Sequence, residues 1–132
     1  MSKEELITAA YAALENAYAP YSHFRVGACV LAKDGRIFCG ANVENASYGL
    51  CCCAERNALF AAIAAGVRPK DIHVLAVVSE RERPPAPCGA CRQVMSELMP
   101  GDALVLMVGS GGVKEMDVAS LLPGAFDKED MQ

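Results

Sequence analysis

Residues 72–108 give the clearest indication of the fold class, and they run IHVLAVVSERERPPAPCGACRQVMSELMPGDALVLMV. Ile72 to Val78 and Ala103 to Val108 are continuous apolar runs of strand length, which is typical of strands buried on both faces. Between them, residues 88–99 predict a helix that ends at the following Pro-Gly pair. A strand, a helix and another buried strand in this order favour a right-handed crossover between neighbouring parallel strands.

The chain on either side of this segment predicts further helices and strands. Ser2-Lys3-Glu4-Glu5 resembles a capping box, and an apolar stripe from Leu6 to Ala17 predicts a helix that ends before Ala19-Pro20. Residues 53–65 are rich in alanine and predict a second helix, which Gly66 ends. The other expected elements are a hairpin of strands 26–32 and 37–41 around Lys33-Asp34-Gly35-Arg36, a weaker strand at 113–116 and a short helical turn near Leu121.

These elements predict a single domain over residues 1–132. The sequence contains no repeat, low-complexity tract or linker that would divide it. A chain of this length buries roughly two-thirds of its unfolded surface, enough for one core. The fold class we expect is α/β, with a three-layer α/β/α sandwich around a mixed five-stranded sheet.

Composition indicates the kind of substrate, the partners and the compartment that we expect. The net charge of −4 is opposite in sign to that of most nucleic-acid binders, so we expect a small diffusible substrate and no nucleic acid. The apolar stretch Ile7 to Leu14 is too short for a membrane span and has acidic flanks, so we expect no membrane partner and no signal sequence. Seven cysteines, an odd number, argue against a complete disulfide framework and favour reduced thiols in the cytoplasm. Cys29 and Cys39 fall within strands, where we expect small core residues.

Three other cysteines have the spacing of a metal site. Cys53 and Cys88 each begin an expected helix, whose positive N-terminal end favours the thiolate form. Cys88 and Cys91 are spaced i, i+3 and therefore lie on one helical face. Zinc prefers four ligands, and the sequence offers no obvious fourth, which leaves a position for water. Glu55 would lie at the helix mouth, where a carboxylate can move protons, so the pattern predicts metal-assisted hydrolysis.

The charge of such a site predicts a compensating cation. Three thiolates with Zn²⁺ carry one net negative charge, which weakens zinc as a Lewis acid. Arg56 is the nearest candidate cation, and we expect its guanidinium to hydrogen-bond to the cysteine sulfurs.

Two other interpretations of the cysteines stay open. A Cys-x-x-Cys at a helix start can be a redox motif, although Gly89-Ala90 between the thiols and a third cysteine upstream fit a metal better. A closed structural zinc would need a fourth thiol, for which Cys51 is better placed than Cys52 because adjacent residues of an extended chain point in opposite directions. Such a closed site would make the chain a non-catalytic, zinc-stabilised interaction module.

Six segments spread over nearly the whole chain also match one known family. They are residues 19–24 (APYSHF), 26–28 (VGA), 40–48 (GANVENASY), 53–56 (CAER), 87–93 (PCGACRQ) and 121–126 (LLPGAF). The chain resembles the cytidine deaminases, in particular the small homotetrameric class whose zinc ligands are all cysteines. Cys51 and Cys52 depart from the family pattern, which does not require them.

The resemblance implies a cofactor, a reaction and a chemical role for Glu55. One zinc ion per subunit would be held by Cys53, Cys88 and Cys91, and Glu55 would be the catalytic acid/base. The reaction would be hydrolytic deamination of cytidine and 2′-deoxycytidine to uridine and 2′-deoxyuridine, with release of ammonia, in pyrimidine salvage. A deaminase of a modified or antibiotic nucleoside is the alternative enzyme.

The resemblance also implies how the nucleoside is bound. Asn42 and Glu44 would bind the ribose hydroxyls, and a carboxylate at this position would repel a phosphate and so favour an unphosphorylated substrate. Phe24 would pack against the pyrimidine, and Ala54 would contact the base through its backbone. Tyr48 and Phe126 would act across subunit boundaries in a homotetramer with shared active sites.

Overall fold

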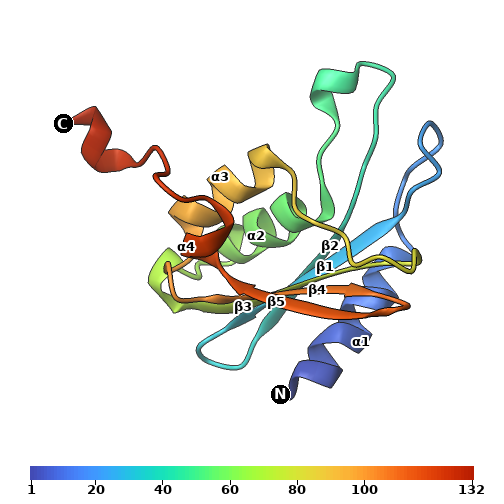
Figure 1. Ribbon diagram of the computed structural model, residues 1–132, viewed down its shortest axis with the longest axis horizontal. Coiled ribbons are helices and arrows are strands. Elements are labelled where there is room, and N and C mark those ends of the chain that lie inside the picture. Colours follow the sequence, from blue (N-terminus) through green and yellow to red (C-terminus); the bar gives the residue numbers. More distant parts are fainter.

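A single mixed sheet forms the centre of the computed structural model, which describes residues 1–132. The sheet order is β2-β1-β3-β4-β5, and the expected three-layer α/β architecture is confirmed (Figure 1). The strands are β1 (Val26–Ala32), β2 (Ile37–Ala41), β3 (Ile72–Ser79), β4 (Leu104–Gly109) and β5 (Gly112–Asp117). The helices are α1 (Lys3–Leu14), α2 (Ala54–Ala64), α3 (Gly89–Leu98) and α4 (Val118–Leu121), with short 3-10 turns at Tyr48–Leu50, Pro69–Asp71 and Lys128–Met131.

The strand directions confirm one parallel pair and refine the rest of the prediction. β3 and β4 are parallel neighbours joined through α3, as their apolar runs predict. β1 is antiparallel to both β2 and β3 and separates them, so α2 connects two parallel strands that are not neighbours. β5 pairs antiparallel with β4 at the far edge.

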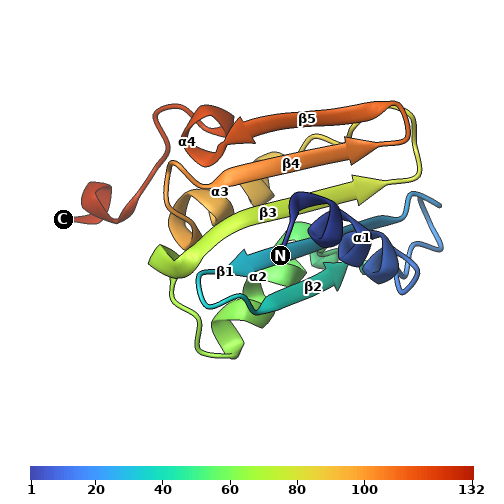
Figure 2. The ribbon, with the colours of Figure 1, turned by 90° about the horizontal axis from the view of Figure 1, so that it is seen from below.

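The helices divide unequally between the two faces of the sheet (Figure 2). α1 alone covers one face, where Leu6, Ala10 and Leu14 pack against residues of β1, β3 and β4. α2, α3 and α4 lie on the other face, and their apolar side chains join the larger of the two buried clusters. The N-terminal ends of α2 and α3 therefore lie on the same side of the sheet, as a shared site requires.

α1 ends earlier than the sequence indicates. Its capping box at Ser2 and Glu5 is present, but the helix stops at Leu14 and not close to Pro20. The chain leaves the helix because Tyr18 pairs with the segment after β2: its N–H donates to the oxygen of Asn42, and its oxygen accepts from Glu44. This short pairing connects the end of α1 to the residues expected to bind ribose.

The placement of Cys39 contradicts the sequence prediction. Cys29 is fully buried, as expected, but Cys39 is exposed because β2 is the edge strand of the sheet. The two residues are directly opposite in the β1–β2 register and form a disulfide. The other cysteines are free, so the structure combines one cross-strand disulfide with five thiols.

Candidate metal centre and substrate site

Two helix starts bring the metal-type cysteines together. Cys53 is the N-cap of α2 and Cys88 the N-cap of α3, and both have extended backbone angles. Neither side chain caps its own helix with a hydrogen bond, so both thiols are free to face a ligand. Cys91, in the first turn of α3, is fully buried.

The sulfur positions fit zinc. The Sγ atoms of Cys53, Cys88 and Cys91 all lie within 4.8 Å of one another. The Sγ atoms of Cys53 and Cys88 are 3.8 Å apart. Sulfurs that bind one tetrahedral zinc at about 2.3 Å are about 3.8 Å from each other, so the donor set has the right chemistry and nearly the right size.

The thiols are prepared electrostatically for a cation. The hydrogen bond with the Cys91 thiol, followed by those from Arg56 and Cys88, lowers the pKa of Cys53 to about 5. The same hydrogen bond and burial raise the pKa of Cys91. The lowered pKa favours the thiolate form of Cys53, which is the form that zinc binds.

Arg56 supplies the expected positive charge. Its Nη2 donates to Sγ of Cys53 at 3.6 Å, and this hydrogen bond raises the pKa of the guanidinium. Nε of Arg56 is buried without a hydrogen-bond partner. An unsatisfied buried donor is costly, so a further acceptor at the metal centre would be stabilising.

Glu55 lies beside these thiols and is unusually buried for a carboxylate. The residue is only 5% exposed and follows Ala54 in the first turn of α2. Burial raises the pKa of Glu55 to about 7. A carboxyl group with this pKa can both take up and release a proton near neutral pH.

The two remaining cysteines of this segment do not join the cluster. Sγ of Cys51 accepts from the N–H of Asn45 at 3.3 Å. Cys52 forms an isolated bridge with Val43. The metal-type cluster contains three cysteines, so the structure does not support a closed site with Cys51 as its fourth ligand.

Asn42 and Glu44 lie together after β2, but each already has partners in the chain. Nδ2 of Asn42 donates to the oxygen of Phe24 at 2.8 Å, and Oδ1 accepts from the N–H of Val26 at 2.9 Å. Oε1 of Glu44 accepts from the N–H groups of Tyr21 and Ser22 at 3.0 and 3.1 Å, and Oε2 accepts from the Ser22 hydroxyl. The Ser22 hydroxyl and these N–H groups lower the pKa of Glu44, which therefore stays ionised.

The aromatic residues lie in different environments. Phe24 is part-buried against the larger core cluster. Tyr48 is 75% exposed, makes an edge-to-face contact with Tyr21 and lines a cavity of ≈ 260 Å³ beside Glu44. Phe126 is 58% exposed, beyond α4, and its oxygen accepts from Nε2 of Gln93 on α3. On the single chain, Tyr48 is close to Glu44, whereas Phe126 belongs to a C-terminal segment that extends from the body (Figure 1).

Sequence reasoning did not find two residues of this region. Ser22 holds Glu44 through its hydroxyl and its N–H. Arg81 places its guanidinium over the ring of Phe24, 3.8 Å from the ring centroid. Ser22 lies in the APYSHF segment, where its type suits a turn. No local pattern in the sequence identifies Arg81.

The fold and the metal centre together define a class of protein. Helices cover both faces of a mixed sheet, and two helix N-termini supply three thiols beside a buried glutamate. This arrangement is that of the zinc-dependent deaminases, whose catalytic glutamate is not a zinc ligand.

Comparison with known proteins gives the family within this class. Residues 1–107 match the model of the cytidine and deoxycytidylate deaminase zinc-binding region, and the chain belongs to this family. It is 54% identical over 132 residues to a cytidine deaminase of Halalkalibacterium halodurans, covering 99% of this chain and 98% of the relative. A cytidine deaminase of Sporosarcina psychrophila is 49% identical over 132 residues, covering 99% and 96%.

Solved structures agree with this assignment. The crystal structure of cytidine deaminase from Burkholderia pseudomallei has a TM-score of 0.93 and 55% identity, covering 96% of this chain and 100% of that one. The structure of cytidine deaminase from Mycobacterium tuberculosis has a TM-score of 0.83 and 38% identity, covering 96% and 98%.

The helices of this chain are all too short or too polar to span a lipid bilayer.

Proposed function

We infer that this chain is a zinc-dependent cytidine deaminase that converts cytidine to uridine and ammonia. The observation that supports this most is the convergence of Cys53, Cys88 and Cys91 beside a buried Glu55, in a chain similar over its full length to named cytidine deaminases. The same site serves 2′-deoxycytidine, which differs from cytidine only in one ribose hydroxyl. The reaction recovers preformed pyrimidine nucleosides, so the enzyme belongs to pyrimidine salvage.

Glu55 performs the proton transfers. Cys53, Cys88 and Cys91 hold one zinc ion per subunit, which when bound acts as a Lewis acid that makes water a better nucleophile at neutral pH. The carboxylate of Glu55 accepts a proton from the attacking water and delivers it to ring atom N3 as oxygen adds to C4. Glu55 then takes the second proton from the hydroxyl now on C4 and gives it to the amino group, so that the C4–N bond breaks, ammonia leaves and C4 keeps its oxygen as the carbonyl of uridine. The Glu55 pKa of about 7 suits both directions of transfer.

The residues around the metal centre bind and orient the nucleoside. The free N–H groups of the first turn of α2, including that of Ala54, are available to the base. Phe24 packs against the pyrimidine ring, and Asn42 and Glu44 receive the ribose hydroxyls. The lowered pKa of Glu44 supports this role, because an ionised carboxylate accepts hydroxyl hydrogen bonds and repels a phosphorylated substrate.

The active enzyme is a homotetramer with shared sites. Its support comes from the segment between β2 and α2, which projects from the body (Figure 1). This segment carries exposed apolar side chains, and exposed apolar surface favours contact with another subunit in water. Tyr48 and Leu50 on this segment are 75% and 71% exposed. Phe126, on the C-terminal segment, completes the site of a neighbouring subunit. The five free thiols, which include Cys53, Cys88 and Cys91, favour a cytoplasmic enzyme.

The reaction is tested by following the ultraviolet absorbance of cytidine with zinc-loaded protein, with ammonia measured in the same tube. We expect uridine and ammonia in equal amounts, and weaker competition by cytidine 5′-monophosphate than by 2′-deoxycytidine. Folded, zinc-containing protein that converts neither nucleoside would reject the proposed function.

Shared sites are tested by mixing two inactive variants. Glu55→Ala lacks the acid/base group, and Phe126→Ala lacks the aromatic ring that a neighbour needs. If Phe126 acts across the subunit boundary, co-refolded mixtures contain intact hybrid sites and regain activity above either variant alone. Mixtures no more active than the average of the two variants would place Phe126 in its own subunit's site or outside any site.

A further inference from the structure

The contact between Arg81 and Phe24 joins two loops that are far apart in the sequence. The guanidinium carbon of Arg81 lies 3.8 Å from the centroid of the Phe24 ring, within the range of a cation–π contact. Phe24 precedes β1, whereas Arg81 follows β3, the strand next to β1. We propose that Arg81 is a positioning residue that fixes the ring of Phe24 for packing against the pyrimidine, an inference that rests on the proposed role of Phe24.

The backbone of Phe24 is already fixed on both sides. Its N–H donates to the Ser22 hydroxyl at 3.0 Å, and its oxygen accepts from Nδ2 of Asn42 at 2.8 Å. Ser22 in turn donates to Glu44. The residues proposed to bind ribose therefore hold the main chain of Phe24, but they do not by themselves set the orientation of its ring, which packs partly against the larger core cluster.

The loop that contains Arg81 is rigidly placed by the β4–β5 hairpin. The oxygens of Arg81 and Glu82 accept from the N–H groups of Ser110 and Gly111 at 2.9 and 3.0 Å. A Cβ at Gly109 would lie 2.7 Å from the oxygen of Arg81, so only glycine permits this close approach. The N–H of Arg81 also donates to the hydroxyl of Ser79, which is fully buried. Arg81 can thus hold the Phe24 ring against a fixed frame.

The guanidinium of Arg81 has no competing ion pair. Arg25, the residue after Phe24 in the sequence, pairs with Glu15 and Glu80, and Arg81 takes part in none of the ion pairs of the chain. The nucleoside is uncharged, so the charge of Arg81 does not attract it directly. The ring of Phe24 is the contact through which we expect Arg81 to influence binding.

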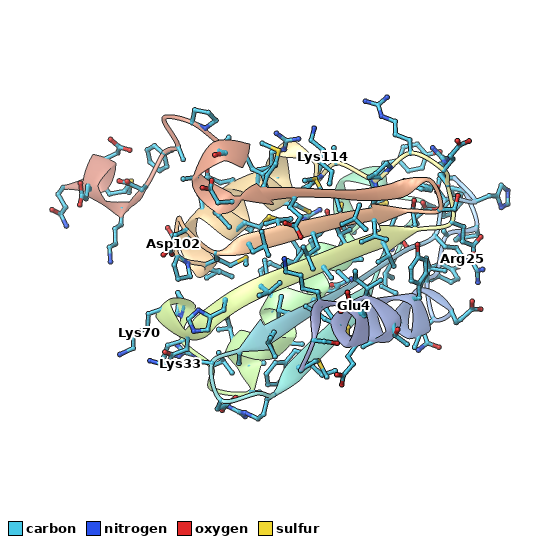
Figure 3. The ribbon with its side chains drawn as sticks, turned by 60° about the horizontal axis from the view of Figure 1, so that its bottom comes forward. Glu4, Arg25, Lys33, Lys70, Asp102 and Lys114 are labelled. Atoms are coloured by element: carbon cyan, nitrogen blue, oxygen red, sulfur yellow. A yellow bond between two sulfur atoms is a disulfide. The ribbon has the colours of Figure 1, made fainter.

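A second arginine over a phenylalanine provides a matched control. The guanidinium carbon of Arg36 lies 5.4 Å from the centroid of the Phe38 ring. Arg36 belongs to the β1–β2 hairpin with Lys33, at the end of the molecule opposite to Arg25 (Figure 3). Removing Arg36 changes a contact of the same chemical type without touching the proposed site.

The test is a double-mutant cycle on cytidine deamination with Arg81→Ala, Phe24→Leu and the double variant. We expect Arg81→Ala to raise KM about three- to fivefold, with kcat within about twofold of the parent, because one partly exposed cation–π contact is lost. In the Phe24→Leu background the same change should raise KM less than about 1.5-fold, because its partner is already gone. Arg81→Lys, which keeps the positive charge, should raise KM less than Arg81→Ala does. Arg36→Ala should leave KM at the parent value.

The outcomes separate this inference from the proposals on which it rests. Equal effects of Arg81→Ala in both backgrounds, or none in either, would overturn the positioning role alone. A parent-like KM for Phe24→Leu would reject the role of Phe24 and this inference with it. Ring resonances of the four phenylalanines, observed in ¹³C-labelled protein, test the contact without any activity. Arg81→Ala should shift the Phe24 ring and speed its flips, and an unchanged Phe24 ring spectrum would also overturn the inference.

Discussion

The side-chain amide of Asn42 donates to the backbone oxygen of Phe24 at 2.8 Å and so connects the proposed ribose contact to the proposed base contact. Its Oδ1 accepts from Val26, the first residue of β1. The two halves of the proposed nucleoside site are therefore built on one hydrogen-bonded unit that is anchored to the sheet.

Asn42→Ala should weaken both the fold and substrate binding. Loss of the two part-buried hydrogen bonds should lower the free energy of unfolding by about 1–3 kcal/mol and raise KM for cytidine. Urea denaturation and steady-state kinetics measure the two effects. Asn57→Ala is the matched control, because Asn57 makes a single part-buried bond to Ala41 and should lose stability with an unchanged KM. Equal KM changes in the two variants would contradict the coupling.

Ser22→Ala should raise the pKa of Glu44 toward its ordinary range. The Ser22 hydroxyl is the largest cause of the lowered value, so its loss favours the protonated carboxyl. Because folding lowers the pKa of Glu44, this carboxylate stabilises the folded protein at pH values above its unfolded pKa. That stability is lost as the pH falls through the folded pKa of Glu44. Titration of the Glu44 carboxyl carbon by NMR measures the midpoint. The carboxyl of Asp117, whose pKa Ser120 lowers, should keep its midpoint in the same sample.

Glu55→Gln should separate metal binding from catalysis. The amide has nearly the same shape but cannot take up the proton, so kcat should fall by about 10²- to 10⁴-fold. The three thiols are unchanged, and the variant should therefore retain one zinc per chain by atomic absorption. Activity close to that of the parent would remove Glu55 from the mechanism, whereas loss of zinc would make Glu55 a structural partner of the centre.

Arg56→Gln should lower both zinc retention and turnover. The amide keeps a donor but loses the charge that stabilises the Cys53 thiolate, so a zinc-loaded variant should release metal to a chelator faster than the parent. Arg68→Gln is the control, because Arg68 donates to the oxygen of Ile63 near the other end of α2. It should change neither zinc retention nor turnover. Unchanged zinc release and unchanged kcat in Arg56→Gln would show that the site needs no compensating cation.

Gly40→Ala should destabilise the contact that places α2. A Cβ at Gly40 would lie 2.7 Å from the nitrogen of Ala58 and 3.0 Å from the oxygen of Ala54, both in α2. The shift of α2 that relieves this overlap should lower the free energy of unfolding by about 1–3 kcal/mol and lower the melting temperature. Gly101→Ala is the control, because its Cβ would meet Ala119 at an ordinary 3.5 Å. Equal melting temperatures for the two variants would mean that α2 can shift freely on β2.

The sequence was sufficient for the fold class and for the metal cluster, because both depend on local spacing. Apolar runs identify β3 and β4, and the helix starts at Cys53 and Cys88 follow from the pattern of residues after them. The prediction that these thiols meet succeeded because two helices on one face of a sheet can bring their N-termini together.

What the sequence did not predict depends on tertiary pairing. Local periodicity continues past Leu14, and only the pairing of Tyr18 with the segment after β2 ends α1 early. Cys39 is a small apolar residue of a type that is often buried, but β2 lies at the edge of the sheet and leaves Cys39 exposed. The β1–β2 register also brings it opposite Cys29. The contact between Arg81 and Phe24 requires two loops to meet, and neither loop has a periodic signal.

The separation of the metal thiols along the chain constrains when the protein can acquire zinc during synthesis. The ribosome releases Cys53 well before Cys88 and Cys91, and β3 lies between the two groups. A nascent chain that has exposed only α1, β1, β2 and α2 presents one of the three thiols. Loading of the metal therefore follows emergence of α3, and a truncated product that ends before Cys88 lacks two of the three ligands and cannot sequester zinc at this site.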